Sequence, residues 1–488
     1  MDQTVPPSNT DSKDKSPGVQ SQRQWSRFFR LNSKLNKFLA SLKFAVFTIS
    51  ILSIIIAAGT LVEAEYNAEV AAKWVYKTPW MFAVMGMLAI SLIAVMVDRW
   101  PWKRKHISFV MAHIGILALL WGAAVTMKYG LDGTMAFEIG RGNRYVRLPE
   151  TEITVWSSLE DDRFAKVFQK EVDLFLNRPS EKEPFKIPVL EGELVVDDYK
   201  PFAIPSRKIE AIDDERAGAA VRFQIQNSRV NVNEWMVQKK QGQTAHHNFG
   251  PAQFHLGPAP KVSLGANELY VEPLAEGLRY SVLYKDPARR PVSGLIREGE
   301  SVKTGWMDLE FKVLRYFPRA VEKWDFKVLS RPTPLTTAAI QFKFQGKEYA
   351  VALDDVVKVY AKSGIYIVAY SHRRIDIGFE MKLTDFQMGL YPGTNRAASY
   401  QSVVELPGVT GQHLISMNEP LKQNGLTFYQ ASFQNGPDGK PTTSILSVNY
   451  DPGRPLKYLG SLILSLGIVL LFYDKRKAAS AAARKMNA

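Results

Sequence analysis

Four long apolar stretches limit what this chain can fold into. They cover residues 44–62, 80–97, 107–127 and 457–473, and the first three contain no Lys, Arg, Asp or Glu. A helix needs about 20 such residues to cross the ~30 Å hydrocarbon core of a membrane. We therefore predict a membrane protein with four transmembrane α-helices, three N-terminal and one C-terminal. The fourth stretch is the shortest, and a buried core helix is its alternative interpretation.

The basic surplus of the chain lies beside these stretches. The formal net charge is +14, of which residues 1–127 carry +7, residues 457–488 carry +5 and residues 128–456 carry only +2. Lys and Arg flank the stretches on alternating sides, so the positive-inside rule places both termini in the cytoplasm and residues 128–456 on the outer side. We found no motif for nucleic-acid binding, and no nucleic-acid partner is expected.

The stretches divide the chain into five expected parts. In order, these are a disordered or basic cytoplasmic segment at 1–37, three transmembrane helices within 38–127, a β-rich outer region at 128–456, a fourth helix at 457–473 and a basic cytoplasmic tail at 474–488. The outer region is predicted to be a β-sandwich or open barrel, because runs such as 375–383 alternate apolar and polar residues. Residues 239–262 are interpreted as a loop between two lobes, and Pro437-Asp438-Gly439 as a hairpin turn.

The absence of cysteine removes several kinds of chemistry. A chain with no Cys has no disulfide, no thiolate metal site, no covalently attached haem and no thiol nucleophile. Motifs for a nucleophilic serine, a P-loop or a zinc protease are also missing, so we predict no catalytic residue. Histidine is then the side chain best suited to bind a metal or haem iron.

Most of the seven histidines lie in polar surroundings. Their spacing at His246, His247 and His255 suits either a weak surface metal site or a plain polar loop. His106 is interpreted as an interfacial residue, and His372 and His413 as structural or surface residues.

His113 differs because it lies inside an apolar stretch. It is about 9 Å from the predicted cytoplasmic end of its helix, and an ionisable group at such a depth is costly and usually functional. Gly115, Ala118 and Gly122 share one face of this helix and could let a neighbouring helix approach closely. His113 projects roughly 140–200° away from them. It is interpreted either as a ligand of a metal or haem iron, or as a residue bonded to a backbone carbonyl of a neighbouring helix.

Several segments resemble the ResB family of cytochrome c biogenesis proteins. Its arrangement of three helices, a β-rich outer region, a last helix and a basic tail is similar to this one. The segments that carry the resemblance are Leu42–Ala45, Ala58–Thr60, His113–Gly115, Gly122–Ala123, Leu383–Phe386, Tyr391–Gly393, Ser416–Leu421, Asn424–Ser432 and Val448–Gly453. It covers roughly residues 38–135 and 375–475. Where many relatives have a Pro-Gln pair this chain has Leu61–Glu65, which is typical of a divergent branch.

The resemblance implies a role in the System II pathway of the bacterial cytoplasmic (inner) membrane. Such a chain works with a ResC/CcsA-type membrane protein in haem transport, and presents haem and apocytochrome c for covalent attachment. It would be the accessory subunit of a holocytochrome c synthase complex, with its large domain in the periplasm. By motif position, His113 would bind the iron of a haem b held together with the partner. The missing cysteines imply that a reductant, such as a thioredoxin-like protein, comes from elsewhere.

Two other functions remain open at this point. The chain could be a membrane-anchored β-rich interaction module of the cell envelope that holds no cofactor. It could also be a membrane enzyme acting on an outside substrate, although the sequence offers no catalytic constellation for that.

Overall fold

The structure, a computed structural model, divides the chain into two compact units. It describes residues 33–486 except 159–162, 250–251, 262–264, 275–276, 287, 395, 409–410 and 437–439. The expected hairpin turn at Pro437-Asp438-Gly439 and most of the expected N-terminal segment therefore lie outside the described residues. Unit 1 comprises residues 1–148 and 374–488, and unit 2 comprises residues 149–373.

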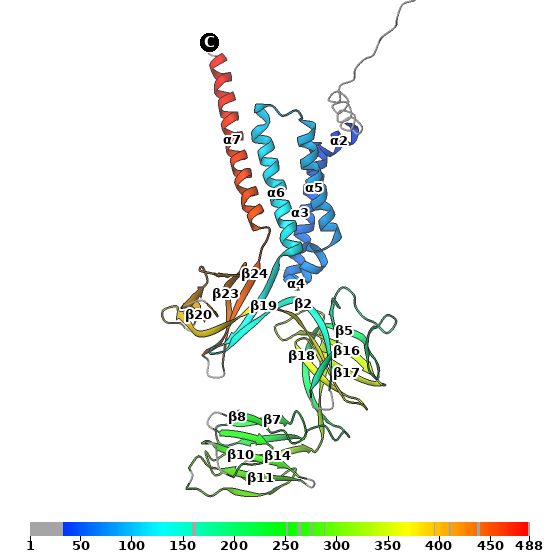
Figure 1. Cartoon of the computed structure of the whole chain (residues 1–488), viewed down its shortest axis with the longest axis vertical. Helices are drawn as coiled ribbons and strands as arrows, with labels where there is room; N and C mark the ends of the chain where they lie inside the picture. Colours follow the sequence, from blue (N-terminus) through cyan, green and yellow to red (C-terminus); the bar gives the residue numbers. More distant parts are fainter. Residues whose placement is uncertain are drawn as a thin grey trace, which may run out of the picture. The chain divides into compact units, whose positions relative to one another are not determined.

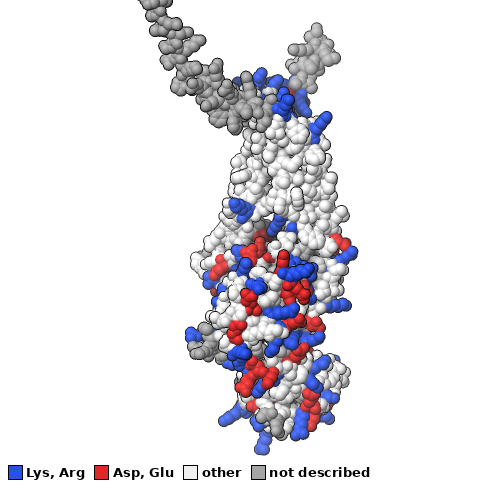
Figure 2. All heavy atoms as spheres, turned by 90° about the vertical axis from the view of Figure 1, so that its right-hand side faces the viewer, with Lys and Arg blue, Asp and Glu red and all other residues white. Residues whose placement is uncertain are grey.

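Four helices of unit 1 are long and apolar enough to cross a membrane. They are α3 (Leu42–Glu65), α5 (Pro79–Asp98), α6 (Ile107–Tyr129) and α7 (Arg454–Met486). In Figure 1 they form the helical part of the chain, and the face of them seen in Figure 2 carries almost no charged side chain. The prediction of four transmembrane helices is confirmed. The short helical elements are α2 (Ser33–Leu39), α4 (Ala68–Ala71), the π-helical turn η1 (Ala72–Tyr76) and the 3₁₀ turn η2 (Arg104–His106).

Local signals in the sequence set where these helices begin. Ser41 caps α3 by accepting a hydrogen bond from the backbone N–H of Phe44 at 3.2 Å. Thr78 caps α5 in the same way, and Pro79 occupies the first turn, where a missing N–H costs nothing. The 24 residues of α3 extend over about 36 Å, which is enough to span the hydrocarbon core.

Two helical boundaries differ from those expected. Helix α2 begins at Ser33, so the last residues of the segment expected to be disordered or basic are helical. Helix α7 continues to Met486, beyond the expected end of the span at 473. Its basic residues after Asp474 therefore belong to a helix that continues past the apolar stretch.

Helices α6 and α7 pack backbone to backbone along a row of glycines. They lie side by side in Figure 1. A Cβ added to Gly115 would lie 2.5 Å from the backbone N of Leu464, and one added to Gly460 would lie 2.8 Å from the carbonyl oxygen of Gly115. Both distances are shorter than any real Cβ contact, so only glycine permits this approach. We call this contact the glycine seam; the other glycines in it are Gly122, Gly453 and Gly467.

Hydrogen bonds to carboxylates fasten both ends of the glycine seam. At one end, Asp451 accepts from Thr126 Oγ1 at 2.5 Å and from Lys457 Nζ at 2.7 Å. Burial raises the pKa of Asp451, but the bonds from Lys457 and Thr126 outweigh it, and the net pKa is below the usual range. At the other end, Ser108 Oγ donates to Asp474 Oδ2 at 2.6 Å.

The sheet of unit 1, which we call the β-lobe, is directly continuous with these two helices. Strand β1 (Leu131–Glu138) follows α6, and β24 (Pro441–Tyr450) precedes α7. The two strands pair antiparallel from Leu131↔Tyr450 to Glu138↔Thr443. The contact between α6 and α7 is thus continued by a strand pair.

The lobe is a curved, mainly antiparallel sheet with an apolar core. Its strand order is β21-β20-β19-β2-β1-β24-β23-β22. Phe137, Met381 and Phe428 are among its buried core residues. The other strands, of which β2 and β19 also continue into unit 2, are β2 (Gly142–Ser158), β19 (Ile365–Leu390), β20 (Ala397–Glu405), β21 (Gln412–Ser416), β22 (Leu421–Gln423) and β23 (Leu426–Asn435).

Unit 2 contains two further apolar cores built by strands. One lies among the parts of β2 and β19 in this unit and the strands β3 (Phe164–Val172), β4 (Phe185–Val189), β5 (Gly192–Ala211), β16 (Thr337–Phe344), β17 (Lys347–Ala352) and β18 (Asp355–Tyr360). Strand β15 (Ala320–Val328) pairs with β5 at the edge of this sheet.

The second core of unit 2 is a sandwich. The sheet β13-β14-β6-β7 packs against the sheet β12-β11-β10-β9-β8 around Phe223, Phe254 and Phe311, all fully buried. The prediction of a β-rich region with a sandwich or open-barrel character is confirmed, and none of the described sheets closes on itself. Its strands are β6 (Ala220–Gln226), β7 (Asn231–Val237), β8 (Ala245–Phe249), β9 (Ala252–Leu256), β10 (Asn267–Pro273), β11 (Leu278–Leu283), β12 (Val292–Ile296), β13 (Ser301–Lys303) and β14 (Glu310–Phe317).

The interpretation of residues 239–262 as a dividing loop is wrong. This segment contains β8 and β9, which pair with each other inside the sandwich. Ala252, Phe254 and Leu256 alternate with polar residues and are fully buried, which is the period-two pattern of a strand. The high content of Gly, Gln, Pro and His in the segment concealed this short alternation.

Candidate functional site

His113 is a half-buried residue on α6. Its Nδ1 lies 2.8 Å from the carbonyl oxygen of Phe109, one turn earlier on the same helix. Since a carbonyl oxygen only accepts, Nδ1 carries the proton and donates it. The hydrogen-bond partner of His113 is therefore a carbonyl of its own helix. The alternative interpretation, a bond to a backbone carbonyl of a neighbouring helix, is wrong.

The bond to Phe109 determines what the other ring nitrogen can do. With Nδ1 protonated, Nε2 of a neutral imidazole holds a lone pair. Among the described residues, Nε2 has no hydrogen-bond partner. A His that donates one N–H to a carbonyl and presents the other nitrogen is the usual arrangement of a metal-binding histidine.

Two further side chains extend this site toward the α5–α6 hairpin. The rings of Phe109 and His113 have centroids 3.9 Å apart. The guanidinium carbon of Arg99, the residue after α5, lies 3.7 Å from the centroid of the Phe109 ring. We call these three residues the Arg99 column. Neither Arg99 nor Phe109 was singled out from the sequence, although Phe109 stands four residues before His113 and therefore on its face of the helix.

The hairpin that carries Arg99 is held by its own hydrogen bonds. Trp102 Nε1 donates to the carbonyl oxygen of Met96 at 2.9 Å, and the backbone N–H of Trp100 donates to Val97 at 3.0 Å. The rings of the two tryptophans contact each other edge to face at 5.1 Å. These contacts fix the chain direction between α5 and η2, on which the position of Arg99 depends.

The opposite face of α6 is the glycine seam. Gly115 and Gly122 face α7, as their closest neighbours show, and Ala118 lies 3.1 Å from the position of a Cβ on Gly460. The expectation that these three residues admit a neighbouring helix agrees with this packing. His113 contacts Phe109 and not this seam.

The remaining histidines form no metal site of three ligands. Among the described residues, no group of three His, Cys, Asp or Glu side chains could hold a metal ion. His246 and His255 face each other across β8 and β9, with ring centroids 6.5 Å apart. His372 Nδ1 lies 2.9 Å from Asp354, and Nε2 of His413 is buried without a partner.

His255 is a partly buried histidine of the sandwich in unit 2. Its ring stacks on Tyr270 at 4.3 Å, and burial lowers its pKa. It is therefore neutral near pH 7. His246, which faces it, is a single further histidine and does not complete a group of three metal-binding side chains among the described residues.

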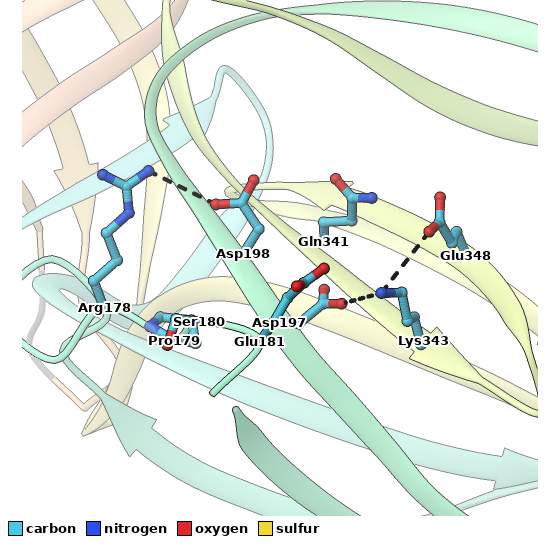
Figure 3. Close-up of a pocket in the computed structure, with 9 residues that line it drawn as sticks. All are labelled: Arg178, Pro179, Ser180, Glu181, Asp197, Asp198, Gln341, Lys343 and Glu348. Carbon is cyan, nitrogen blue, oxygen red and sulfur yellow. Dashed lines mark ion pairs between the residues drawn. The ribbon is translucent and has the colours of Figure 1, made fainter. Parts of the chain in front are cut away.

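A polar hollow in unit 2 offers charge pairs but no catalytic arrangement. Figure 3 shows Asp197 beside Lys343 and Asp198 beside Arg178, at 2.7 and 3.7 Å respectively. The hollow measures about 450 Å³ and lacks the apolar lining typical of small-molecule sites. Because both aspartates face cations, we assign it no chemical role.

The haem that the resemblance implies can be tested against the residues present. The donor set suits a single axial ligand, because His113 presents Nε2 from an apolar helix. The described residues contain no group of three metal-binding side chains, so the fit of this site to haem rests on His113 alone.

Comparisons with known proteins find similarity over part of this chain. Residues 362–443 match the model of the ResB-like family; these residues include all of β19 to β23. A stretch of 111 residues is 33% identical to Protein NrfI of Wolinella succinogenes, and it represents 22% of this chain and 12% of NrfI. The chain thus matches only a small part of the length of that relative. His113 lies outside the range that matches the family.

Proposed function

We propose that this chain, which matches the ResB-like family over residues 362–443, is a subunit of System II cytochrome c biogenesis. In this role it takes part in haem transport across the membrane, and it presents haem and apocytochrome c for covalent attachment. The observation that carries the proposal is the family match, most of which lies in the β-lobe joined to α6 and α7.

The proposed topology has both termini in the cytoplasm and the large β-rich region in the periplasm. The Lys and Arg residues of the α5–α6 hairpin and of the end of α7 support it, because such residues remain on the cytoplasmic side. The helices are those of a membrane protein, and the orientation is the part that we propose.

We assign the haem contact of this chain to His113. Nδ1 of His113 donates to the carbonyl oxygen of Phe109 at 2.8 Å, which leaves Nε2 available to bind the iron. Haem b is the cargo here, and it supplies the iron porphyrin that becomes attached to the apocytochrome.

The chain is proposed as an accessory subunit and not as an enzyme alone. Bond formation between haem and the apocytochrome thiols would take place mainly on the partner. A chain without cysteine forms no mixed disulfide with these thiols, so a thioredoxin-like protein is the proposed source of reducing equivalents.

An absorption spectrum of the full-length chain copurified with its ResC/CcsA-type partner tests the haem assignment. The comparison is wild type, His113→Ala and, as control, His106→Ala. His106 is a histidine of the same hairpin whose Nδ1 accepts from the backbone N–H of Lys103. We expect a haem Soret band in wild type and in His106→Ala, and its loss or shift in His113→Ala.

Three outcomes separate the possible roles. If all three proteins carry the same haem spectrum, the ligands lie on the partner, and His113 has a structural role only. If no intact complex binds haem, the role narrows to apocytochrome binding. If deletion of the gene leaves the c-type cytochromes intact, the biogenesis role is wrong, and the envelope interaction module without cofactor becomes the better interpretation.

A further inference from the structure

The guanidinium group of Arg99 stands at the open end of the Arg99 column. It lies over the Phe109 ring at 3.7 Å, and that ring lies 3.9 Å from the His113 ring. Arg99 itself is exposed, whereas Phe109 and His113 belong to the apolar helix α6. The column therefore leads from the end of α5 to the nitrogen that we assign to the haem iron.

Arg99 has positive charge that the described residues do not neutralise by an ion pair. None of the described carboxylates, including that of the adjacent Asp98, lies within ion-pair distance of its guanidinium. Its contact is with the face of an aromatic ring, which restrains the side chain but uses none of its five N–H donors. A restrained guanidinium with unused donors is suited to bind an incoming carboxylate.

The chemistry of haem requires such a group near this end of the helix. Haem carries two propionate carboxylates on one edge, and a carboxylate left in hydrocarbon without a partner is strongly unfavourable. His113 lies only about 9 Å along α6 from the helix start. The propionate edge of a haem bound to His113 can thus reach the polar end of the hairpin without crossing the membrane.

Resting on the proposed haem contact of His113, we propose that Arg99 binds a haem propionate. The propionate edge then points to the α5–α6 hairpin, and the opposite, apolar edge points along α6 toward its other end. Arg99 is thereby a cargo-binding residue that selects the carboxylate form of the porphyrin and sets its direction.

Neighbouring basic residues provide a matched control. Lys105 lies in the same hairpin, is exposed, and has no ring beneath it among the described contacts. A general attraction of the basic hairpin for an anion would depend on Lys105 as much as on Arg99. A directed contact would depend on Arg99 alone.

The test is a titration of the full-length chain in lipid nanodiscs with haemin and with haemin dimethyl ester, whose propionates are uncharged. The proteins are wild type, Arg99→Gln, Arg99→Lys, Lys105→Gln and His113→Ala, and the readout is the Soret band at each porphyrin concentration. We expect wild type and Lys105→Gln to bind haemin about tenfold more tightly than the ester, the size of one charge-assisted hydrogen bond.

The variants of Arg99 should remove this preference. Arg99→Gln should bind haemin about tenfold more weakly than wild type and the ester equally well, while Arg99→Lys should keep part of the preference. Equal weakening for both porphyrins, or an unchanged preference in Arg99→Gln, would overturn the role of Arg99. If wild type instead shows no binding that depends on His113, the haem contact of His113 is wrong, and the role of Arg99 falls with it.

Discussion

The two faces of α6 differ in their contacts and in their expected roles. One face is closed against α7 through the glycine seam, where atoms would collide if any Cβ were added to Gly115. The other carries His113, Phe109 and Arg99, with a ring nitrogen and a guanidinium that other described residues do not occupy. The seam holds the chain together, and the open face leaves contacts for a ligand. Substitutions on the two faces should therefore affect different measurements.

The largest expected loss of stability is at the centre of the glycine seam. Gly115→Leu places a side chain where the backbone N of Leu464 already lies 2.5 Å from a Cβ, and the two helices must separate. We expect the free energy of unfolding to fall by about 3 kcal/mol or more. Unfolding in detergent micelles, followed by tryptophan fluorescence, measures it.

Gly86→Leu is the control for this substitution. Gly86 lies in α5, and a Cβ there would meet no atom within 4 Å. Similar losses in the two variants would show that the change reflects helix propensity or lipid exposure and not the seam.

The next effect is expected at Asp451, where the seam meets the β-lobe. Asp451→Asn removes the negative charge of the group that accepts hydrogen bonds from Thr126 and Lys457. It should lower the free energy of unfolding by about 1.5–3 kcal/mol. Asp132→Asn is the control, since Asp132 is an exposed residue of β1. Equal stability of the two variants would contradict a fastening role for Asp451.

Asp451 should also make stability depend on pH. Its folded-state pKa is lowered, so its contribution is complete above the unfolded-state pKa of about 3.9 and is lost as the pH falls through the lower folded-state value. A melting temperature measured from pH 6 down to pH 3 should decrease more in wild type than in Asp451→Asn. Parallel curves would argue against this linkage.

A smaller effect is expected at the other end of the seam. Ser108→Ala removes the bond to Asp474 at 2.6 Å and should cost about 1 kcal/mol. Ser461→Ala loses only a bond to Lys457 of its own helix and serves as the reference. If the two substitutions have the same effect in the unfolding measurement, the bond between helices adds nothing.

The smallest effect on stability, and the clearest on ligand binding, is expected on the open face. Phe109→Leu keeps an apolar side chain at a lipid-facing helix and should change the unfolding free energy by less than about 1 kcal/mol. It removes the ring between Arg99 and His113, so haem affinity in the same preparation should decrease. If Phe109→Leu instead lowers the unfolding free energy strongly and binds haem with normal affinity, the two faces of α6 do not have these separate roles.

The sequence predicted the helices and the seam because both depend on local composition. Runs without charge identify spans, and three small residues at helical spacing identify a face where backbones approach. It could not name α7 as the neighbour of α6, since pairing across residues 130–453 leaves no local signal. Strands β8 and β9 were missed for a related reason. Their short alternation is stabilised by burial of Phe254 against Phe223 and Phe311 of the facing sheet, and the local sequence does not show this packing.

The candidate site was predictable only in part. His113 was found because a titratable residue in an apolar run is unusual, whereas its bond to Phe109 follows from rotamer and packing. In the sequence, Arg99 is only one of several basic residues that flank the apolar stretches. Its contact with Phe109 depends on how the α5–α6 hairpin turns, and the bond from Trp102 to Met96 that fixes this turn is not evident from a charge count.

The continuity of α6 with β1, and of β24 with α7, also bears on the order in which this chain can be made. Residues 130–453 separate the two helices of the seam, so a ribosome must synthesise the whole of them before α7 exists. Until then the glycine face of α6 has no partner and β1 lacks β24. The synthesis of α7 therefore allows the glycine seam to form after β24 has paired with β1. Chains truncated before α7 should expose that unfilled face to lipid and to quality-control proteases.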